Sequence, residues 1–372
     1  MKKKILFTAF NLDIGGVEKC LVNLVNNLNK DKYDITIYLQ VKEGTFLNKV
    51  NETIEVKGYN LTKIKNKYLK KIVNIFKYLK ILLTNFHKYD ISICYAPGYV
   101  PSAILALISS KNNIAWMHTN ILTYMDNYLP YKSKKISTEK KAKKFLNRMF
   151  FRKFNKKIFV SQNALCAYLS IYPQDKNSCT TIYNLIDYKE INKLSKETLL
   201  EKNKKYTFLN VGRHTEYDKR LSRLINACEK LKKDKYDFEL LLVGSGVDTE
   251  NYKKIVKAKK LDKYIKFIGK KTNPYPYFKI SNAFVLSSAF EGLPTTYLES
   301  LVLNLPIITT DVSDAQILIK DRYGLVMENN DDAIYYGMKE AIDKKIELKK
   351  CFDPKKYNED IIKKLESEIN CD

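Results

Sequence analysis

The second half of this sequence places two cations directly after a run that reads as a buried strand. Gly212 and Arg213 follow the apolar run ending at Val211, and Lys219 comes just before a helical pattern. The fork of a guanidinium holds two oxygens of a phosphate group, and an ammonium adds a point charge. We therefore expect Arg213 and Lys219 to bind a diphosphate. In so lysine-rich a chain, the alternative is a solvated pair of surface cations.

A second segment joins two carboxylates to a helix start. Glu291 lies in the loop after the predicted strand 283–287, and Glu299 lies eight residues further on, within the next helix. Carboxylates accept hydrogen bonds from sugar hydroxyls, but they repel a diphosphate unless cations intervene, so this loop makes sense together with Arg213 and Lys219. Backbone N–H groups at the helix start suit phosphate oxygens. We expect the free N–H groups of Leu293, Thr295 and Thr296 to face phosphate, with Pro294 at the first helical position after Gly292.

The first half offers two weaker candidates. Gly15 and Gly16 follow the first apolar run and open a helix, where N–H groups could approach an anion. A simple turn is the alternative. His118 ends the run 113–118 and is a candidate for contact with a sugar hydroxyl, although a lone histidine after a strand can also be structural.

Short apolar runs alternate with longer helical patterns up to about residue 325, which is typical of βαβ units with parallel sheets. A chain of 372 residues is also longer than one hydrophobic core usually serves. We predict two Rossmann-like, doubly wound α/β domains. The predicted strands are 4–10, 35–40, 53–56, 91–95, 114–118, 158–161 and 180–183, then 206–211, 238–243, 265–268, 283–287, 307–310 and 324–327.

The predicted boundary lies in the polar stretch 184–205, which we expect to be a linker. This gives a first domain over 1–185 and a second over 186–353. Residues 354–372 follow as a helix with Ile361, Ile362, Leu365 and Ile369 on one face. That face needs a surface to cover, and we expect the helix to pack back toward the first domain.

The charge and the cysteines limit the class of protein. The formal net charge is +25, which suits a polyanion or an acidic membrane but also follows from an AT-rich genome. Seven cysteines without a C-x-x-C pair indicate reduced thiols. The opening apolar run is too short for a signal peptide, and no run is long enough to span a membrane. We expect a cytoplasmic protein, soluble or peripheral on the inner face of the plasma membrane.

Two basic stretches stand out in the first half. Nine lysines and no acid lie within 57–89, and twelve Lys or Arg against one Glu lie within 131–157. The second stretch interleaves its cations with aromatic residues, so it could lie on an anionic lipid surface and place a lipid-linked acceptor. An ordinary amphipathic helix with a solvated lysine face is the alternative.

In combination these motifs resemble the retaining, metal-independent glycosyltransferases of the GT-B fold, specifically family 4. The motifs, which match best over 206–327, occur in the family's order: GGVE at 15–18, the Val-Gly-Arg strand end with its downstream lysine, the turn at Gly244, and the pair Glu291 and Glu299. The segment between Arg213 and Lys219 is one residue longer than the commonest family spacing. Lys219 could therefore exchange roles with Arg220.

The resemblance implies two domains facing across a cleft, with roles for the matching residues. Arg213 and Lys219 would bind the donor diphosphate and stabilise the leaving group, Glu299 would bind the ribose, and Glu291 would contact the transferred sugar. The groups near the donor would be Gly15, Gly16, His118, Gly244, Gly292, Leu293, Thr295 and Thr296. No D-x-D motif is present, so we expect neither a metal ion nor another cofactor.

The reaction that the resemblance implies is transfer of a hexose or related sugar from a nucleotide diphosphate sugar, UDP-linked in preference to GDP-linked. The acceptor would be a glycan, lipid-linked, in the synthesis of a bacterial surface polysaccharide such as capsule or lipopolysaccharide. Three other hypotheses stay open at this point. They are a nucleic-acid-binding protein, which no recognition motif supports, a nucleotide-sugar epimerase of the same fold, and a non-catalytic subunit that binds sugar nucleotides.

Overall fold

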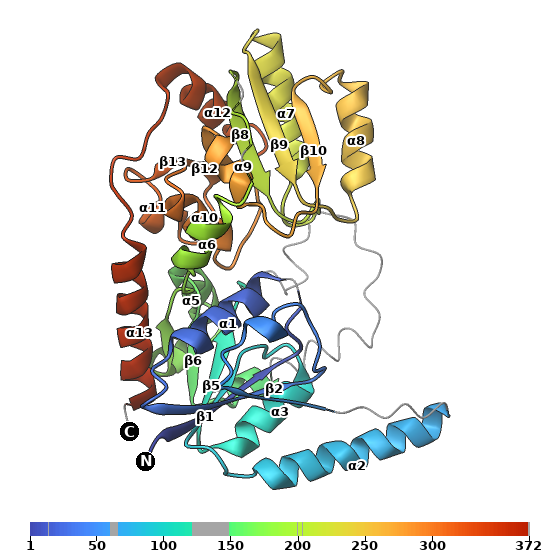
Figure 1. The fold of residues 1–372 in the computed structure, drawn as a ribbon, viewed down its shortest axis with the longest axis vertical. Helices are drawn as coiled ribbons and strands as arrows, with labels where there is room; N and C mark the ends of the chain where they lie inside the picture. Colours follow the sequence, from blue (N-terminus) through green and yellow to red (C-terminus); the bar gives the residue numbers. More distant parts are fainter. Residues whose placement is uncertain (14, 60–65, 121–148, 199, 203, 371–372) are drawn as a thin grey trace. The chain divides into compact units, whose positions relative to one another are not determined.

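The computed structural model describes residues 1–13, 15–59, 66–120, 149–198, 200–202 and 204–370. The chain divides into two compact units. The first comprises residues 1–185 and 358–372, and the second comprises residues 186–357. Each is an α/β unit built on one parallel sheet, and the two are described separately (Figure 1).

The first unit has a seven-stranded sheet in the order β3-β2-β1-β4-β5-β6-β7. All pairings are parallel, and the order reverses between β1 and β4, where a doubly wound sheet binds its ligand. The strands are β1 (Lys3–Ala9), β2 (Tyr33–Leu39), β3 (Glu55–Gly58), β4 (Ile91–Cys94), β5 (Asn112–Met117), β6 (Lys156–Phe159) and β7 (Cys179–Thr181). The helices among the described residues are α1 (Gly16–Asn27), α2 (Lys67–Asn85), α3 (Val100–Ser109) and α5 (Gln162–Leu169), with 3-10 turns at Leu47–Lys49 and Pro173–Ser178.

The second unit has a six-stranded parallel sheet in the order β10-β9-β8-β11-β12-β13, which reverses between β8 and β11. Its strands are β8 (Tyr206–Val211), β9 (Phe238–Val243), β10 (Ile265–Gly269), β11 (Ala283–Leu286), β12 (Ile307–Thr310) and β13 (Gly324–Met327). Its helices are α6 (Tyr188–Leu194), α7 (Leu221–Lys233), α8 (Thr249–Ala258), α9 (Tyr275–Ile280), α10 (Thr295–Val302), α11 (Ala315–Leu318) and α12 (Ala333–Lys344).

Each face of the second sheet has its own buried core. One cluster joins the sheet to α7, α8 and α12 through residues such as Leu224, Tyr252 and Met338. The other joins it to α6, α9 and α10 through Ile191, Phe278 and Tyr297. Because strands of a doubly wound sheet are covered on both faces, they read as mostly apolar runs, and Phe238–Val243 is such a run apart from Glu239.

The last helix, α13 (Pro354–Asn370), begins in the second unit and continues on the first. Its buried residues include Ile361, Leu365 and Ile369, as the apolar pattern predicts. Its carboxyl end meets the edge of the first sheet, where Lys3 Nζ donates to the carbonyl of Ile369 at 3.1 Å. Lys156 Nζ likewise donates to the carbonyl of Glu368 at 2.7 Å. The expectation that this helix packs on the first domain is confirmed.

The stretch 184–205 contains the boundary between the two units, at 185/186. It also contains α6, which the sequence did not indicate, and the Asp187 side chain caps the first turn of this helix by accepting from the N–H of Glu190 at 2.9 Å. In the basic stretch 131–157, residues 131–148 lie outside the described residues. Phe151 and Phe154 are buried in the core of the first unit, so these two side chains are not available to lipid, whereas Arg152 and Lys153 are exposed.

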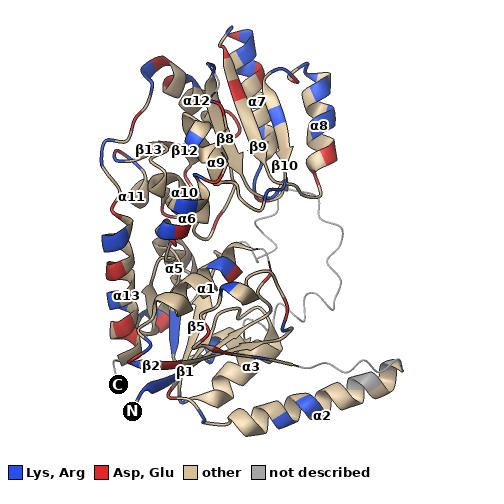
Figure 2. Cartoon of the chain, viewed as in Figure 1, with Lys and Arg blue, Asp and Glu red and all other residues tan. Residues whose placement is uncertain are grey.

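Charged residues are spread over both units, but unevenly (Figure 2). Helix α13 carries both signs, and Glu366 lies 3.4 Å from Lys32. Helix α2 carries lysines and no acidic residue. No helix in the described parts of the chain is long and apolar enough to cross a bilayer.

Candidate donor site

The strongest candidate site lies at the carboxyl ends of β8 and β11, the neighbouring strands at which the order of the second sheet reverses. The loop after β8 and the loop after β11 are tied to each other by hydrogen bonds. Ser287 Oγ donates to the carbonyl of Lys219 at 2.9 Å, and the N–H of Ala289 donates to the carbonyl of Asp218 at 2.8 Å. The cationic and acidic segments are therefore one structural unit.

Lys219 and Glu291 meet in this unit. The ammonium of Lys219 donates to Oε1 of Glu291 at 2.5 Å, and their side chains are only 19% and 13% exposed. Ser288 Oγ donates to the same oxygen at 2.6 Å. The carboxylate is thus neutralised by a lysine, which removes the repulsion that an isolated Glu291 would exert on a diphosphate.

Arg213 behaves differently from Lys219. Its side chain is 76% exposed, and its guanidinium lies 3.4 Å from the carboxylate of Asp218. Asp218 also accepts a short hydrogen bond from the hydroxyl of Thr215. Most of the guanidinium surface is therefore accessible to a ligand.

Arg220, the alternative to Lys219, points to another partner. It precedes α7 with a left-handed backbone, φ 49°, and its guanidinium lies 3.5 Å from Glu216. Glu216 also accepts hydrogen bonds from Ser222 Oγ at 2.6 Å and Tyr252 Oη at 2.8 Å. This network holds Arg220 away from Glu291, so the structure brings Lys219 into the candidate site.

The acidic loop leads into α10 as the sequence indicates, with one small correction. Pro294 is the N-cap residue rather than the first helical residue, and the helix begins at Thr295. The N–H groups of Thr295 and Thr296 therefore belong to the first turn, where backbone donors lack partners within the helix. The hydroxyl of Ser313 donates to the carbonyl of Gly292 and fixes the turn before it. Leu293 and Glu299 are buried, at 7% and 6% exposure.

The turn after β9 requires its glycines. Gly244 has φ +144°, and a Cβ there would lie 1.9 Å from the carbonyl oxygen of Gly212. A Cβ at Gly246 would lie 2.3 Å from the carbonyl oxygen of His214. Because glycine has no Cβ, the backbone after β8 and the backbone after β9 can run close together. The N–H of His214 donates to the carbonyl of Ser245 at 3.1 Å. The loop that carries Arg213 is thereby held against the turn at 244–246.

The first unit supplies a second set of predicted residues, at the carboxyl ends of β1 and β5. Gly15 is the N-cap of α1, and Gly16 is its first residue. A Cβ at Gly15 would lie 2.1 Å from the carboxylate of Glu18, so that side chain bends back over the start of the helix. An anion bound at this helix terminus would have to displace the Glu18 carboxylate.

His118 directly follows β5 and packs against aromatic rings. Its ring centroid lies 4.3 Å from that of Tyr95 and 6.4 Å from that of Trp116. Burial lowers the pKa of His118 to about 3. A hydrogen bond with the backbone of Tyr95 raises the pKa, but this effect is smaller than that of burial. Its Nε2 is buried and has no hydrogen-bond partner among the described residues. This histidine is therefore neutral at physiological pH and has an unused polar atom.

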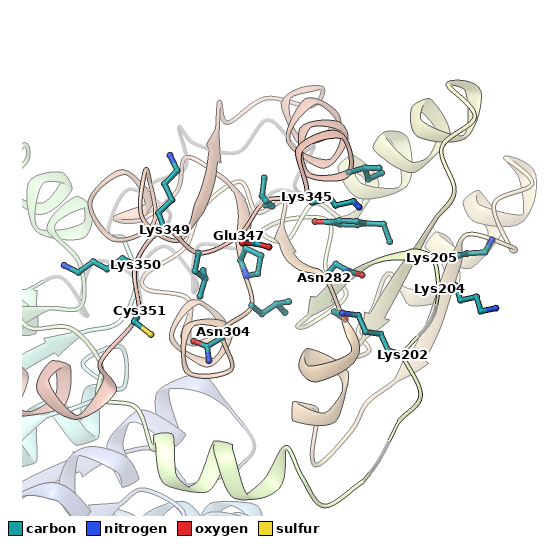
Figure 3. A pocket seen from close by; sticks show the side chains of 17 residues that line it. Lys202, Lys204, Lys205, Asn282, Asn304, Lys345, Glu347, Lys349, Lys350 and Cys351 are labelled. Atoms are coloured by element: carbon teal, nitrogen blue, oxygen red, sulfur yellow. The ribbon is translucent and has the colours of Figure 1, made fainter.

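A hollow of about 890 Å³ lies elsewhere in the second unit (Figure 3). It is lined by residues that precede β8, β11 and β12, including Lys205, Asn282 and Pro306, and by the segment 345–351 after α12. These positions are at the amino ends of the strands. Ligands of doubly wound sheets bind at the carboxyl ends, so we do not assign the donor to this hollow.

Three polar residues of the candidate site were not predicted from the sequence: Asp218, Ser288 and Ser313. They orient Arg213, Glu291 and the carbonyl of Gly292. Within the described residues, no group of three His, Cys, Asp or Glu is placed as a metal centre would need.

Comparison with known proteins places the chain in a family. Residues 14–190 match the family described as Glycosyltransferase Family 4, and residues 192–361 match the family described as Glycosyl transferases group 1. Among solved structures, the Anabaena protein HepE in complex with UDP and glucose is similar in fold. Its TM-score is 0.73, with 18% identity and coverage of 98% of this chain and 100% of that one. The fold is GT-B. The chain belongs to the glycosyltransferases, with its first half in the one family and its second half in the other.

Three relatives extend this picture. An uncharacterized glycosyltransferase of Methanocaldococcus jannaschii is 26% identical over 72% of this chain and 64% of its own length. The capsular polysaccharide biosynthesis glycosyltransferase CapH of Staphylococcus aureus is 26% identical over 84% of this chain and 82% of its own length. The third, from Campylobacter jejuni, is 29% identical over 44% of each chain. It is named as an N-acetylgalactosaminyltransferase acting on a diphospho-undecaprenol-linked saccharide.

Proposed function

We propose that this protein is a retaining, metal-independent glycosyltransferase that moves a hexose or related sugar from a UDP-sugar, in preference to a GDP-sugar, to a lipid-linked glycan. The product would belong to a bacterial surface polysaccharide, and the enzyme would work at the cytoplasmic face of the plasma membrane. The observation that carries the proposal is the contact of 2.5 Å between Lys219 and Glu291 beside the first turn of α10. The relatives named above do not favour an epimerase or a silent subunit.

The proposed chemistry follows from the charges at this site. As the bond between sugar and diphosphate breaks, negative charge grows on the phosphate and positive charge on the anomeric carbon. Arg213, Lys219 and the first amides of α10 would stabilise the leaving phosphate, each donor contributing about 3 kcal/mol. Lys219 would bridge the phosphate and Glu291, and Glu291 would hold hydroxyls of the transferred sugar.

The remaining predicted residues would have supporting roles. Glu299 would accept from the ribose hydroxyls, and Gly244 would let the nucleotide approach the backbone near the end of β9. His118 is neutral, so it would exchange hydrogen bonds with a hydroxyl rather than supply a positive charge. The leaving phosphate would assist removal of the acceptor's proton on the same face of the sugar, which requires no protein nucleophile.

The choice of UDP and of a lipid-linked acceptor rests on similarity. The structure of HepE holds UDP and glucose, and the name of the Campylobacter relative specifies a diphospho-undecaprenol acceptor. These properties belong to those proteins, and we carry them to this chain as part of the proposal.

The test is a donor screen followed by a transfer assay. UDP- and GDP-sugars are added to the protein with a metal chelator, and thermal unfolding is followed. A donor at about 100 times its dissociation constant should stabilise the fold by about 2.7 kcal/mol. The shift should be lost in Arg213→Ala. Incubation of that donor with a polyprenyl-diphosphate glycan should give a product whose new linkage has the donor's anomeric configuration. Stabilisation by no sugar nucleotide, or an inverted linkage, would contradict the proposal.

A further inference from the structure

Helix α2 exposes a continuous apolar stripe. Of the fifteen large hydrophobic side chains that are exposed among the described residues, eight lie on α2 or directly after it. Leu83 is 78% exposed, Phe76 is 67% exposed and Phe86 is 61% exposed. The stripe consists of Tyr68, Leu69, Ile72, Ile75, Phe76, Leu79, Leu83 and Phe86. Steps of three and four residues separate most of its members, so they share one side of the helix.

The other side of α2 is fixed to the first unit. Tyr78 Oη donates to the carbonyl of Pro101 at 2.9 Å, and Tyr78, Ile81 and Leu82 pack on a buried cluster that includes Tyr38. Asn85 is 5% exposed. The helix is thus a docked element of the fold, and its exposed stripe lies on a different side of the helix from Tyr78, Ile81 and Leu82. An exposed apolar surface of this extent marks an interaction site.

The charge around the stripe indicates what covers it. Lys77, Lys80 and Lys88 are exposed, and the segment 57–89 contains nine lysines and no acid. In Figure 2 this helix carries the colour of basic residues and nowhere that of acidic ones. A second copy of the chain packed stripe to stripe would bring lysines against lysines, which is repulsive. An anionic bilayer offers hydrocarbon for the stripe and phosphate for the lysines.

We propose that α2 lies in the headgroup region of an anionic lipid bilayer, with its apolar stripe inserted among the acyl chains and its lysines at the lipid phosphates. This inference assigns membrane contact to a segment other than 131–157. It rests on observations independent of the donor site in the second unit. It deepens the proposed function, because an enzyme held on the bilayer by its first unit meets an acceptor that is itself a lipid.

The first experiment measures flotation of the full chain with vesicles of phosphatidylcholine containing about one-third phosphatidylglycerol. Phe76→Ser with Leu83→Ser should raise the lipid concentration for half binding about tenfold or more. The matched control replaces Ile317 and Tyr336, which are 49% and 60% exposed in the second unit, by serine and should bind as the wild type does. Binding of the α2 variant at the wild-type lipid concentration, or an equal loss in the control, would overturn the proposal.

The contribution of the α2 lysines to lipid binding is tested with two double variants, each of which replaces two lysines three residues apart. Lys77→Glu with Lys80→Glu should weaken binding about fivefold or more for each residue on anionic vesicles. Lys254→Glu with Lys257→Glu changes two exposed lysines of α8 at the same spacing and should have little effect. An equal loss in both variants would mean that net charge alone drives binding and would refute the role of α2. Conversion of a wild-type dimer to monomer by the stripe variant would instead identify a second copy as the occupant.

A conservative variant covers the case in which the polar substitutions do not fold. Trp116 is the only tryptophan of the sequence and is buried, so Leu79→Trp adds a reporter to the stripe. Its fluorescence should be quenched by brominated lipids, and an unquenched reporter would overturn the proposal. Thermal stabilisation by a UDP-sugar without lipid should be unchanged in every α2 variant. Failure of that stabilisation in the wild type would count against the donor site and leave the membrane inference standing.

Discussion

The ammonium of Lys219 and the carboxylate of Glu291 lie 2.5 Å apart although 72 positions separate them in the chain. Two loops at the ends of adjacent parallel strands are required to bring them together. Both side chains are largely buried, so each determines the electrostatic environment of the other. Variants at Lys219 and at Glu291 should therefore affect ligand binding and turnover in different ways.

Lys219→Ala should reduce kcat about 100-fold or more, because it removes a cation from the leaving phosphate and also leaves Glu291 uncompensated. Arg220→Ala is the matched control. It breaks the ion pair with Glu216 and should lower stability by about 1 kcal/mol, with kcat close to that of the wild type. Steady-state kinetics and urea unfolding of both variants check this. A larger kcat loss in Arg220→Ala than in Lys219→Ala would assign the phosphate to Arg220.

Glu291→Gln should separate binding from turnover. The amide keeps the shape of the side chain but removes a negative charge near the diphosphate, so UDP should bind as tightly as in the wild type or more tightly. Transfer should slow about tenfold or more, because the hydrogen bonds that the sugar hydroxyls donate to an ionised carboxylate are lost. Calorimetric titration with UDP and initial rates provide the two readouts. A parallel loss of UDP affinity and rate would show that Glu291 serves only to hold the loop.

Gly244→Ala should destabilise the protein by about 1 to 3 kcal/mol, because the backbone there has φ +144° and the new Cβ would meet the carbonyl of Gly212. Gly212→Ala provides the comparison, since a Cβ at that position meets nothing within 4 Å. Denaturation midpoints measure the difference. Equal midpoints for the two variants would exclude a close approach of β8 and β9 at this turn.

The pH dependence of stability should carry a contribution from His118. Its pKa of about 3 in the folded protein lies below the ordinary value of 6.5, so the unfolded chain binds the proton first as pH falls. The stabilising contribution is complete above pH 6.5 and is lost progressively between 6.5 and 3, reaching about 2 kcal/mol of loss at pH 5. His118→Phe should flatten this part of the profile, as measured by urea unfolding at pH 7 and pH 5. A slope unchanged by the substitution would show that His118 is solvated.

Addition of a chelator should leave the transfer rate unchanged, and added Mg²⁺ should not raise it, since Arg213, Lys219 and the amides of α10 are proposed to carry the phosphate charge. The measurement is the initial rate with the preferred sugar nucleotide in each buffer. A rate abolished by the chelator and restored by Mg²⁺ would contradict the metal-independent mechanism.

The sequence predicted the architecture well because its strands are unambiguous. Runs such as Tyr206–Val211 and Ile307–Thr310 are apolar or β-branched, and their observed bounds match the predicted ones. Each lies between sheet neighbours and is covered on both faces, so little but a buried strand fits the pattern. The helix α6 was missed because its seven residues are mostly polar and only Ile191 is fully buried.

The details of the site were harder to predict, because they depend on side-chain direction rather than on residue type. Lys219 and Arg220 are adjacent cations, and only the left-handed backbone at Arg220 and the network around Glu216 separate their roles. Asp218 and Ser288 are ordinary loop residues whose significance arises from contacts with residues distant in sequence. The lysines of 57–89 were visible in the sequence, but the exposed apolar side of α2 was not identified from it.

The return of α13 to the first unit makes that unit discontinuous along the chain, with the whole second unit inserted before its last helix. During synthesis, residues 1–185 emerge from the ribosome well before the segment that covers their apolar surface around Ile361, Leu365 and Ile369. The second unit is encoded without interruption and can fold as soon as it is released. The first unit can therefore complete its fold only after α13 has been synthesised, whereas the second unit can fold before that point.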